Sequence, residues 1–203
     1  MKAVPMGTAL QRARTGQLMR LAGLMEPQRV LIAGEGDGSF LLQFVQLFPE
    51  ASITVVEPSQ AMVLRAQTRL RQAGLFSERI VFKVEPLMDA ALVEASYDLI
   101  VTLFFLDNFE DSLMRASVSK LNACASEQAY WLLSDFCLPS AGWRRLRAKL
   151  WLKVLYQFFA FSAGLSARAL PDFEQALQTT KFCEIHRDGH CGDLLFSALY
   201  RAE

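Results

Sequence analysis

Short apolar runs alternate along the chain with longer stretches in which apolar residues recur at helical spacing. The short runs predict buried strands, because they are rich in branched and aromatic residues and end at glycine, proline or charged residues. They lie at residues 29–33, 52–57, 79–84, 97–105, 129–136, 182–186 and 194–200. The longer stretches predict helices at residues 8–25, 39–48, 59–73, 87–95, 111–124 and 172–180. Ser39 and Ser59 begin two of these helices, where a serine hydroxyl can cap the first turn.

The order of these elements predicts an α/β fold. Strands that alternate with helices favour a parallel sheet covered on both faces. The last two strands are separated only by a turn at roughly 187–193, and a parallel crossover needs ~12 residues, so this pair is predicted to be an antiparallel hairpin. The expected fold is therefore a Rossmann-like, doubly wound, seven-stranded and mostly parallel sheet with a C-terminal antiparallel hairpin strand.

No repeat or linker divides the chain, so we expect one domain over residues 1–203. Residues 1–28 would form an N-terminal helical cap, and residues 140–170 a helical lid between the fifth and sixth strands.

The most apolar segment of the chain, residues 150–165, is predicted to be an amphipathic helix. It is shorter than the ~20 apolar residues that a membrane span needs. Polar residues recur in and before it at every fourth position, namely Arg145, Lys149, Lys153 and Gln157. Two interpretations stay open: a lid that binds a lipophilic acceptor near a membrane surface, or a helix that covers the sheet with its charges in solvent.

Charge and composition exclude some partners. Lys+Arg and Asp+Glu both number 21, so no overall positive field favours nucleic acid. The N-terminal residues lack the pattern of a secretory signal, which predicts a cytoplasmic protein. Its four scattered cysteines, Cys124, Cys137, Cys183 and Cys191, are expected to be reduced core residues.

Glycines at the first predicted strand-to-helix turn indicate a ligand site. Gly34, Gly36 and Gly38 allow a sharp turn and a close approach of ligand to backbone, beside the free N–H groups of a helix start. Glu57 ends the second strand, where a carboxylate can accept hydrogen bonds from both hydroxyls of a ribose. The alternatives are a plain glycine-rich turn and a solvated acid at a helix start.

The residues between these glycines favour one class of cofactor over another. A nicotinamide dinucleotide site has the spacing G-x-G-x-x-G and holds a pyrophosphate at the helix start. Here Glu35 and Asp37 lie between the glycines, and acids beside a pyrophosphate would repel it. A ligand with an amino group and a sulfonium is the better match.

Five segments carry a resemblance to a known family. LIAGEGDGSF followed by VVEPS resembles motif I and the acidic loop of the class I S-adenosylmethionine-dependent methyltransferases, and YDLIVTLFFLDNF and AYWLLSDFCLP are similar to their fourth- and fifth-strand motifs. RALPDFEQALQTTKFCEIHR resembles the C-terminal stretch of ubiquinone/menaquinone-type small-molecule methyltransferases. The resemblance implies S-adenosylmethionine as cofactor, S-adenosylhomocysteine as product, and a small molecule as methyl acceptor, with a lipophilic molecule as one option.

The resemblance also implies which residues surround the cofactor. They are Gly34, Glu35, Gly36, Gly38, Glu57, Pro58, Met62, Glu85, Thr102 and Leu103. Pro86 stands where the family commonly has an acid that contacts adenine, so either Glu85 or backbone groups would take that role. Met62 is read equally well as an ordinary core residue.

Asp107, just past the fourth strand, is the candidate catalytic base or acceptor anchor, with a helix N-cap as its alternative. Asp135 is a weaker candidate of the same kind.

Cys183 and His186 do not have the spacing of a zinc site, so no metal is expected. A catalytically degenerate binding or scaffold protein is the alternative function, and the oligomeric state is expected to be a monomer or homodimer.

Overall fold

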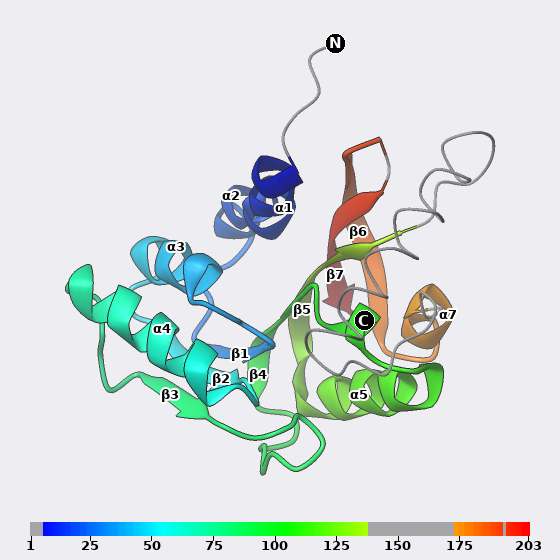
Figure 1. Ribbon diagram of the computed structural model, residues 1–203. Coiled ribbons are helices and arrows are strands. Elements are labelled where there is room, and N and C mark those ends of the chain that lie inside the picture. Colours follow the sequence, from blue (N-terminus) through cyan, green and yellow to red (C-terminus); the bar gives the residue numbers. More distant parts are fainter. Residues whose placement is uncertain (1–5, 138–172, 193) are drawn as a thin grey trace.

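One mixed sheet forms the centre of the protein (Figure 1). The computed structural model describes residues 6–137, 173–192 and 194–203. Within them, seven strands form a single sheet in the order β3-β2-β1-β4-β5-β7-β6. The strands are β1 (Arg29–Ala33), β2 (Ser52–Val56), β3 (Ile80–Lys83), β4 (Tyr97–Leu103), β5 (Ala125–Phe136), β6 (Phe182–His190) and β7 (Leu195–Ala202).

The pairing of the strands confirms the predicted topology. The strands from β3 to β5 pair in parallel, β7 runs antiparallel to β5, and β6 runs antiparallel to β7. Because β1, β2, β4 and β5 are parallel, their carboxyl ends lie along one edge of the sheet. The strand order changes direction between β1 and β4, and a ligand binds at such a point in sheets of this kind.

Helices cover both faces of the sheet, as expected for a doubly wound fold. One apolar cluster joins the sheet to α2 (Leu18–Ala22), α3 (Ser39–Leu47) and α4 (Gln60–Gln72). The cluster on the other face includes α5 (Asp111–Cys124) and α7 (Phe173–Leu177). The inner strands β1, β4 and β7 are buried on both sides over most of their length, which explains their continuous apolar runs, whereas the edge strand β6 is largely exposed.

The first predicted helix is two helices in the structure. α1 (Met6–Thr15) and α2 are separated at Gly16, where an added Cβ would lie 2.7 Å from the Arg12 carbonyl oxygen. Gln17 is buried after it and donates to Asp188 Oδ2 at 2.8 Å and to the Ser197 carbonyl oxygen at 3.3 Å. These bonds to the C-terminal hairpin hold the chain in a turn that the helical spacing did not reveal.

Two other local predictions are wrong. Residues 87–95 form turns instead of a helix, and the Lys120 ammonium donates to the Met88 and Ala90 carbonyl oxygens, both at 2.8 Å. Ser39 does not cap α3, because Gly38 is the N-cap residue; the cap on α4 is confirmed, since the Ser59 side chain accepts from the Met62 N–H.

The cysteines do not all lie in the core. Cys124 is buried, but Cys183 and Cys191 are exposed, because the edge strand β6 and the hairpin turn present them to solvent. The predicted lid at 140–170 and the apolar segment at 150–165 lie outside the described residues. In the described part of the chain, no helix is long and apolar enough to cross a membrane.

Candidate cofactor and acceptor site

The three glycines of the first turn have different structural roles. All adopt positive φ, at 74° for Gly34, 71° for Gly36 and 83° for Gly38. A Cβ on Gly34 would overlap the Phe105 ring, and one on Gly38 would lie 2.6 Å from the Ala66 Cα. A Cβ on Gly36 would meet nothing within 4 Å. Two glycines therefore permit close packing, whereas Gly36 borders open space.

Glu57 faces this loop from the end of β2. Its side chain is only 8% exposed, so the interpretation as a solvated acid is wrong. Its Oε2 accepts from the Gly36 N–H at 3.1 Å, and its Oε1 accepts from the Ser59 N–H at 3.0 Å. Each carboxylate oxygen has two acceptor positions, so both can still accept a ligand hydroxyl. The carboxylate thus fixes the loop and keeps its capacity to bind two neighbouring hydroxyls.

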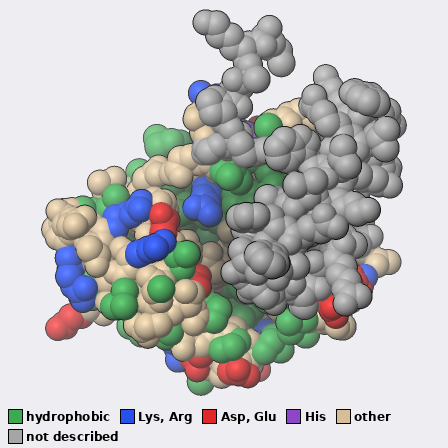
Figure 2. Space-filling view, in the orientation of Figure 1, with side chains coloured by type: hydrophobic (Ala, Val, Ile, Leu, Met, Phe, Trp, Pro, Cys, Tyr) green, Lys and Arg blue, Asp and Glu red, His purple; other side chains and the backbone are tan. Residues whose placement is uncertain are grey.

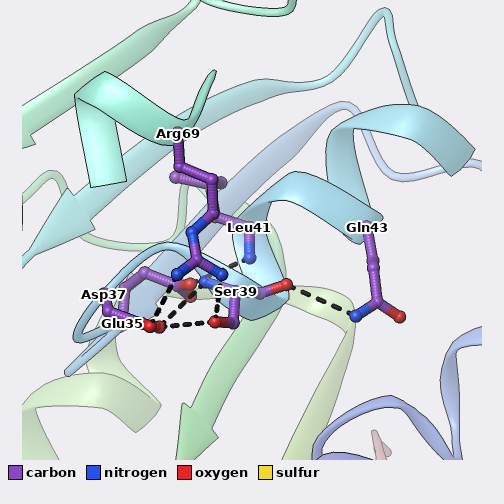
Figure 3. A network of polar contacts seen from close by, with 6 residues as sticks. All are labelled: Glu35, Asp37, Ser39, Leu41, Gln43 and Arg69. Atoms are coloured by element: carbon purple, nitrogen blue, oxygen red, sulfur yellow. Dashed lines mark hydrogen bonds and ion pairs between the residues drawn. The ribbon is translucent and has the colours of Figure 1, made fainter. Parts of the chain in front are cut away.

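Glu35 caps the following helix from beneath the loop (Figure 3). It is buried, and its Oε1 accepts from the Leu41 N–H at 2.9 Å, in the first turn of α3. Its Oε2 is buried and has no hydrogen-bond partner among the described residues. Burial raises the pKa of this carboxyl to about 8, against the opposing effects of the Leu41 N–H and the Arg14 charge. Glu35 is therefore a mostly neutral acid at neutral pH.

Asp37 is held in a second set of contacts on the outer side of the loop (Figure 3). Its Oδ1 accepts from the Ser39 N–H at 3.1 Å and the Ser39 Oγ at 2.6 Å, and its Oδ2 forms an ion pair with Arg69 at 2.9 Å. Partial burial opposes ionisation, but the Ser39 hydrogen bonds and the Arg69 charge outweigh it and lower the pKa of Asp37. The contact ties the loop to α4, and sequence reasoning missed it because Arg69 lies 32 positions further along the chain.

The chain turns sharply where β4 ends. Phe104 has a φ of +55°, which is unfavourable for a bulky residue, and such strain is typical of functional sites. The Asn108 Nδ2 stabilises the turn by donating to the Phe104 carbonyl oxygen at 2.9 Å and the Phe105 carbonyl oxygen at 3.2 Å. The turn places the Phe105 ring against Gly34 and edge-on to Phe109, with ring centroids 4.9 Å apart.

The two predicted site residues at the end of β4 are both buried. The Thr102 hydroxyl accepts from the Trp131 indole N–H at 2.9 Å, so it is already used within the core. The Leu103 side chain packs in the apolar cluster on the α3 face. These contacts leave their backbone, not the Thr102 hydroxyl, as the part that can face a ligand.

Asp107 and Asp135 lie together at the same edge of the sheet. Asp107 is 5% exposed in a short 3-10 helix, η1 (Leu106–Asn108), and Asp135 is 1% exposed near the end of β5. Asp135 Oδ2 accepts from the Asp107 N–H at 3.3 Å, and its Oδ1 accepts from the Phe136 N–H at 2.9 Å. Asp107 is not the cap of the next helix, because Glu110 holds that position.

Burial changes how this pair of acids ionises. It raises the pKa of Asp107 to about 6, although the hydrogen bond with Asp135 works in the opposite direction. Burial, with the charge of Asp107, raises the pKa of Asp135 well above its ordinary value. The two carboxyls therefore titrate as a pair, in which the charge of Asp107 opposes ionisation of Asp135.

The remaining predicted residues lie around the ends of β2 and β3. Met62 is half-buried in the first turn of α4, and Pro58 is exposed beside Glu57. Glu85 follows β3 and lies 3.8 Å from the Lys83 ammonium. Among the residues that the structure describes, no three His, Cys, Asp or Glu side chains are grouped as metal ligands.

The comparisons with known proteins agree with this geometry. Residues 30–127 match a methyltransferase domain family. A search among curated proteins found no match. Solved methyltransferase structures share the fold at low sequence identity, so the chain has the fold of the class I methyltransferases.

Three of these solved structures illustrate the likeness. N-methyltransferase NodS from Bradyrhizobium japonicum WM9, in complex with S-adenosylhomocysteine, is 18% identical with a TM-score of 0.67, over 95% of this chain and 87% of that one. The 1,6-didemethyltoxoflavin-N1-methyltransferase of Burkholderia thailandensis, which holds 1,6-didemethyltoxoflavin and S-adenosylhomocysteine, is 16% identical with a TM-score of 0.67, over 96% and 78%. A SAM-dependent methyltransferase from Aquifex aeolicus is 15% identical with a TM-score of 0.66, over 99% and 95%.

Proposed function

We propose that this protein binds S-adenosylmethionine and transfers its methyl group to a small molecule. The observation that carries the proposal is the open space at Gly36 beside the buried Glu57 carboxylate, inside the segment that matches a methyltransferase domain. A scaffold protein would need the Glu57 carboxylate only to fix the loop, whereas a cofactor site also needs the open space beside Gly36.

The residues present fit the cofactor. Glu57 would hold the two ribose hydroxyls, and the backbone at Gly36 would lie against the chain that links the sugar to the methionine end. Met62, in the first turn of α4, and Glu85, just after β3, would border the adenine. The bound cofactor supplies a methyl group activated by a positively charged sulfur.

The protein's own contribution to the reaction is alignment and exclusion of water. Methyl transfer is an in-line displacement, so holding the acceptor opposite the methyl group accounts for much of the rate. The end of β4, at Thr102 and Leu103, would flank the reacting atoms. The strained turn at Phe104 keeps this wall rigid, because Asn108 bonds both carbonyl oxygens of the turn.

We infer that Asp107 takes the proton that an acceptor hydroxyl or amine loses. A bound cofactor would supply the methyl group, and a carboxylate oxygen of Asp107 would take the proton that the acceptor gives up on methylation. With its pKa raised to about 6, Asp107 is ionised at neutral pH and basic enough to act. Asp135, which accepts from the Asp107 N–H, would act as the residue that positions Asp107.

The acceptor is proposed to be a small molecule. One solved methyltransferase of similar fold holds 1,6-didemethyltoxoflavin, which supports this class of acceptor. A lipophilic acceptor of the ubiquinone/menaquinone type, contact with a membrane surface through residues 140–170, a cytoplasmic location and a monomeric or homodimeric state stay predictions from sequence.

Calorimetric titration tests the proposal directly. We expect S-adenosylhomocysteine to bind with one site per chain and NAD to give no heat of binding. Binding of NAD alone would indicate a nicotinamide enzyme instead. Absence of binding by both ligands would support the scaffold interpretation and contradict the proposed function.

A further inference from the structure

The helices on one face of the sheet carry positive charge only. α2, α3 and α4 pack through one apolar cluster onto the same face, so their outer sides point away from it in the same direction. Together they contain four arginines and no lysine, aspartate or glutamate. Asp37 neutralises Arg69 through their ion pair at 2.9 Å. The other three, Arg20, Arg65 and Arg71, are exposed and form no ion pair with a residue that the structure describes.

Exposed apolar side chains lie beside these three arginines. Met19 in α2 and Leu64 in α4 each directly precede one of them, and they are 74% and 52% exposed. Phe76, just after α4, is also exposed, and its ring centre lies 4.3 Å from the Arg71 guanidinium carbon. Each arginine without an ion pair therefore has an apolar side chain next to it on the outer surface.

The acidic side chains gather elsewhere on the molecule. Residues 84–98 contain four acids and neither lysine nor arginine. Figure 2 shows basic side chains over α4 and acidic side chains along the lower edge of the view. The chain as a whole has no net charge, so the outer side of α2, α3 and α4 is positive because the charges are unevenly distributed.

We propose that this side of the molecule, the α2–α4 face, docks on an anionic lipid surface. Arginines are attracted to such a surface, while neighbouring apolar side chains enter the boundary between headgroups and acyl chains. The core of a protein–protein interface is apolar and poor in charge, whereas here each apolar side chain stands beside an arginine. Phosphates of a nucleic acid would engage the arginines but not the apolar side chains.

This docking goes beyond the proposed methyl transfer and does not depend on it. It also uses other residues than the segment 140–170. α3 begins directly after the glycine loop and α4 begins shortly after Glu57, so the α2–α4 face borders the proposed cofactor site. Docking would bring that site to the phase in which a lipophilic acceptor dissolves.

Sedimentation of the whole chain with lipid vesicles tests the inference. We expect binding to phosphatidylcholine vesicles that contain about one-third phosphatidylglycerol, and little binding to phosphatidylcholine alone. Each basic residue near an anionic surface strengthens binding roughly fivefold. A variant with Arg20→Gln, Arg65→Gln and Arg71→Gln should therefore bind the anionic vesicles roughly a hundredfold more weakly.

Matched variants separate a membrane contact from a general effect of charge. A variant with Met19→Ser, Leu64→Ser and Phe76→Ser keeps every charge, yet it should also bind the anionic vesicles more weakly. Arg71→Gln alone should lose roughly fivefold in binding. Arg115→Gln removes one positive charge from α5, on the other face of the sheet, and should bind like the wild type.

Three results would overturn the inference. Equal binding of the wild type to neutral and anionic vesicles would exclude an electrostatic contact. Wild-type binding by the triple arginine variant would mean that another part of the chain binds the lipid. Tighter binding to single-stranded RNA than to vesicles, unchanged in the triple serine variant, would indicate a nucleic-acid surface.

Calorimetry with S-adenosylhomocysteine keeps this inference separate from the proposed function. The variants change exposed side chains outside the proposed cofactor site, so each should bind this ligand with wild-type affinity, which shows that a loss of docking is not a loss of the fold. If the wild type binds anionic vesicles but no S-adenosylhomocysteine, the docking stands and the proposed function has failed.

Discussion

The open space at Gly36 makes a substitution there the most informative test of the site. We predict that Gly36→Ala weakens S-adenosylhomocysteine binding far more than it weakens the fold. The added Cβ meets no protein atom within 4 Å, so inside the protein its only cost is the positive φ of 71°. That strain amounts to about 1–2 kcal/mol for an L-residue.

The loss of binding follows from overlap with the ligand. If the cofactor lies against this backbone, a methyl group there forces it to shift, and an extra methyl in a well-packed site costs about 1–3 kcal/mol. This cost corresponds to a dissociation constant that is roughly 5- to 150-fold higher. Gly36→Val adds two further carbons in the same place, so no binding is expected to be detectable.

Gly74 provides a matched control on the same protein. It follows α4 with a φ of 70°, and a Cβ there also meets nothing within 4 Å. Gly74→Ala should therefore cost the same stability as Gly36→Ala, read as a shift of the melting temperature of about 2–4 °C per kcal/mol. Only the Gly36 variant should lose affinity for S-adenosylhomocysteine in calorimetry.

Two results would refute this reasoning. Wild-type affinity in Gly36→Ala would mean that no ligand lies against the loop at this point. Equal loss of affinity in both variants would mean that binding responds to global stability. Gly34→Ala and Gly38→Ala are not useful substitutes, because their Cβ atoms would collide with Phe105 and Ala66 and unfold the loop first.

Substitutions at three further residues test the acidic groups of the site. Glu57→Ala should weaken S-adenosylhomocysteine binding by about 1.5–3 kcal/mol for each charge-assisted bond lost; calorimetry that finds unchanged affinity removes Glu57 from the site. Because the pKa of Glu35 is about 8 in the folded protein, the folded state binds more protons than the unfolded state, and stability should fall as pH rises from about 5 to about 8. Glu35→Gln should reduce that fall in urea unfolding, and an identical pH profile would contradict the raised pKa. Asp135→Leu removes the hydrogen bond that lowers the pKa of Asp107. The midpoint of the pH profile of kcat/KM should therefore move above about 6. Asp135→Asn can still donate a hydrogen bond, so it should leave the midpoint nearly unchanged.

The sheet could be predicted from sequence because neighbouring residues along the chain determine each strand. Each strand is a short apolar run, and the turn before β7 is too short for a crossover, so the reversed strand follows from chain length alone. Helix ends were less predictable where distant groups decide them. Gly16 breaks the first helix because Gln17 bonds Asp188 and Ser197, residues near the other end of the chain.

The site was predictable as a set of positions but not as a set of contacts. Parallel strands bring their carboxyl ends to one edge, which is why Asp107 and Asp135 could both be suspected. That the Asp135 carboxylate accepts from the Asp107 N–H depends on the turn after β4. Likewise, the sequence shows three equivalent glycines, and only the positions of Phe105 and Ala66 reveal that Gly36 is the one facing open space.

The preference against a pyrophosphate has a different physical basis from the one that the sequence suggested. Glu35 and Asp37 were expected to repel a phosphate by charge, yet Glu35 is mostly neutral and Asp37 is paired with Arg69. What these acids do is occupy the N–H groups at the start of α3: Asp37 accepts from Ser39, and Glu35 accepts from Leu41. A dinucleotide needs those same N–H groups for its pyrophosphate. The helix start is already capped from within, so a ligand in this loop must be held by groups other than phosphates.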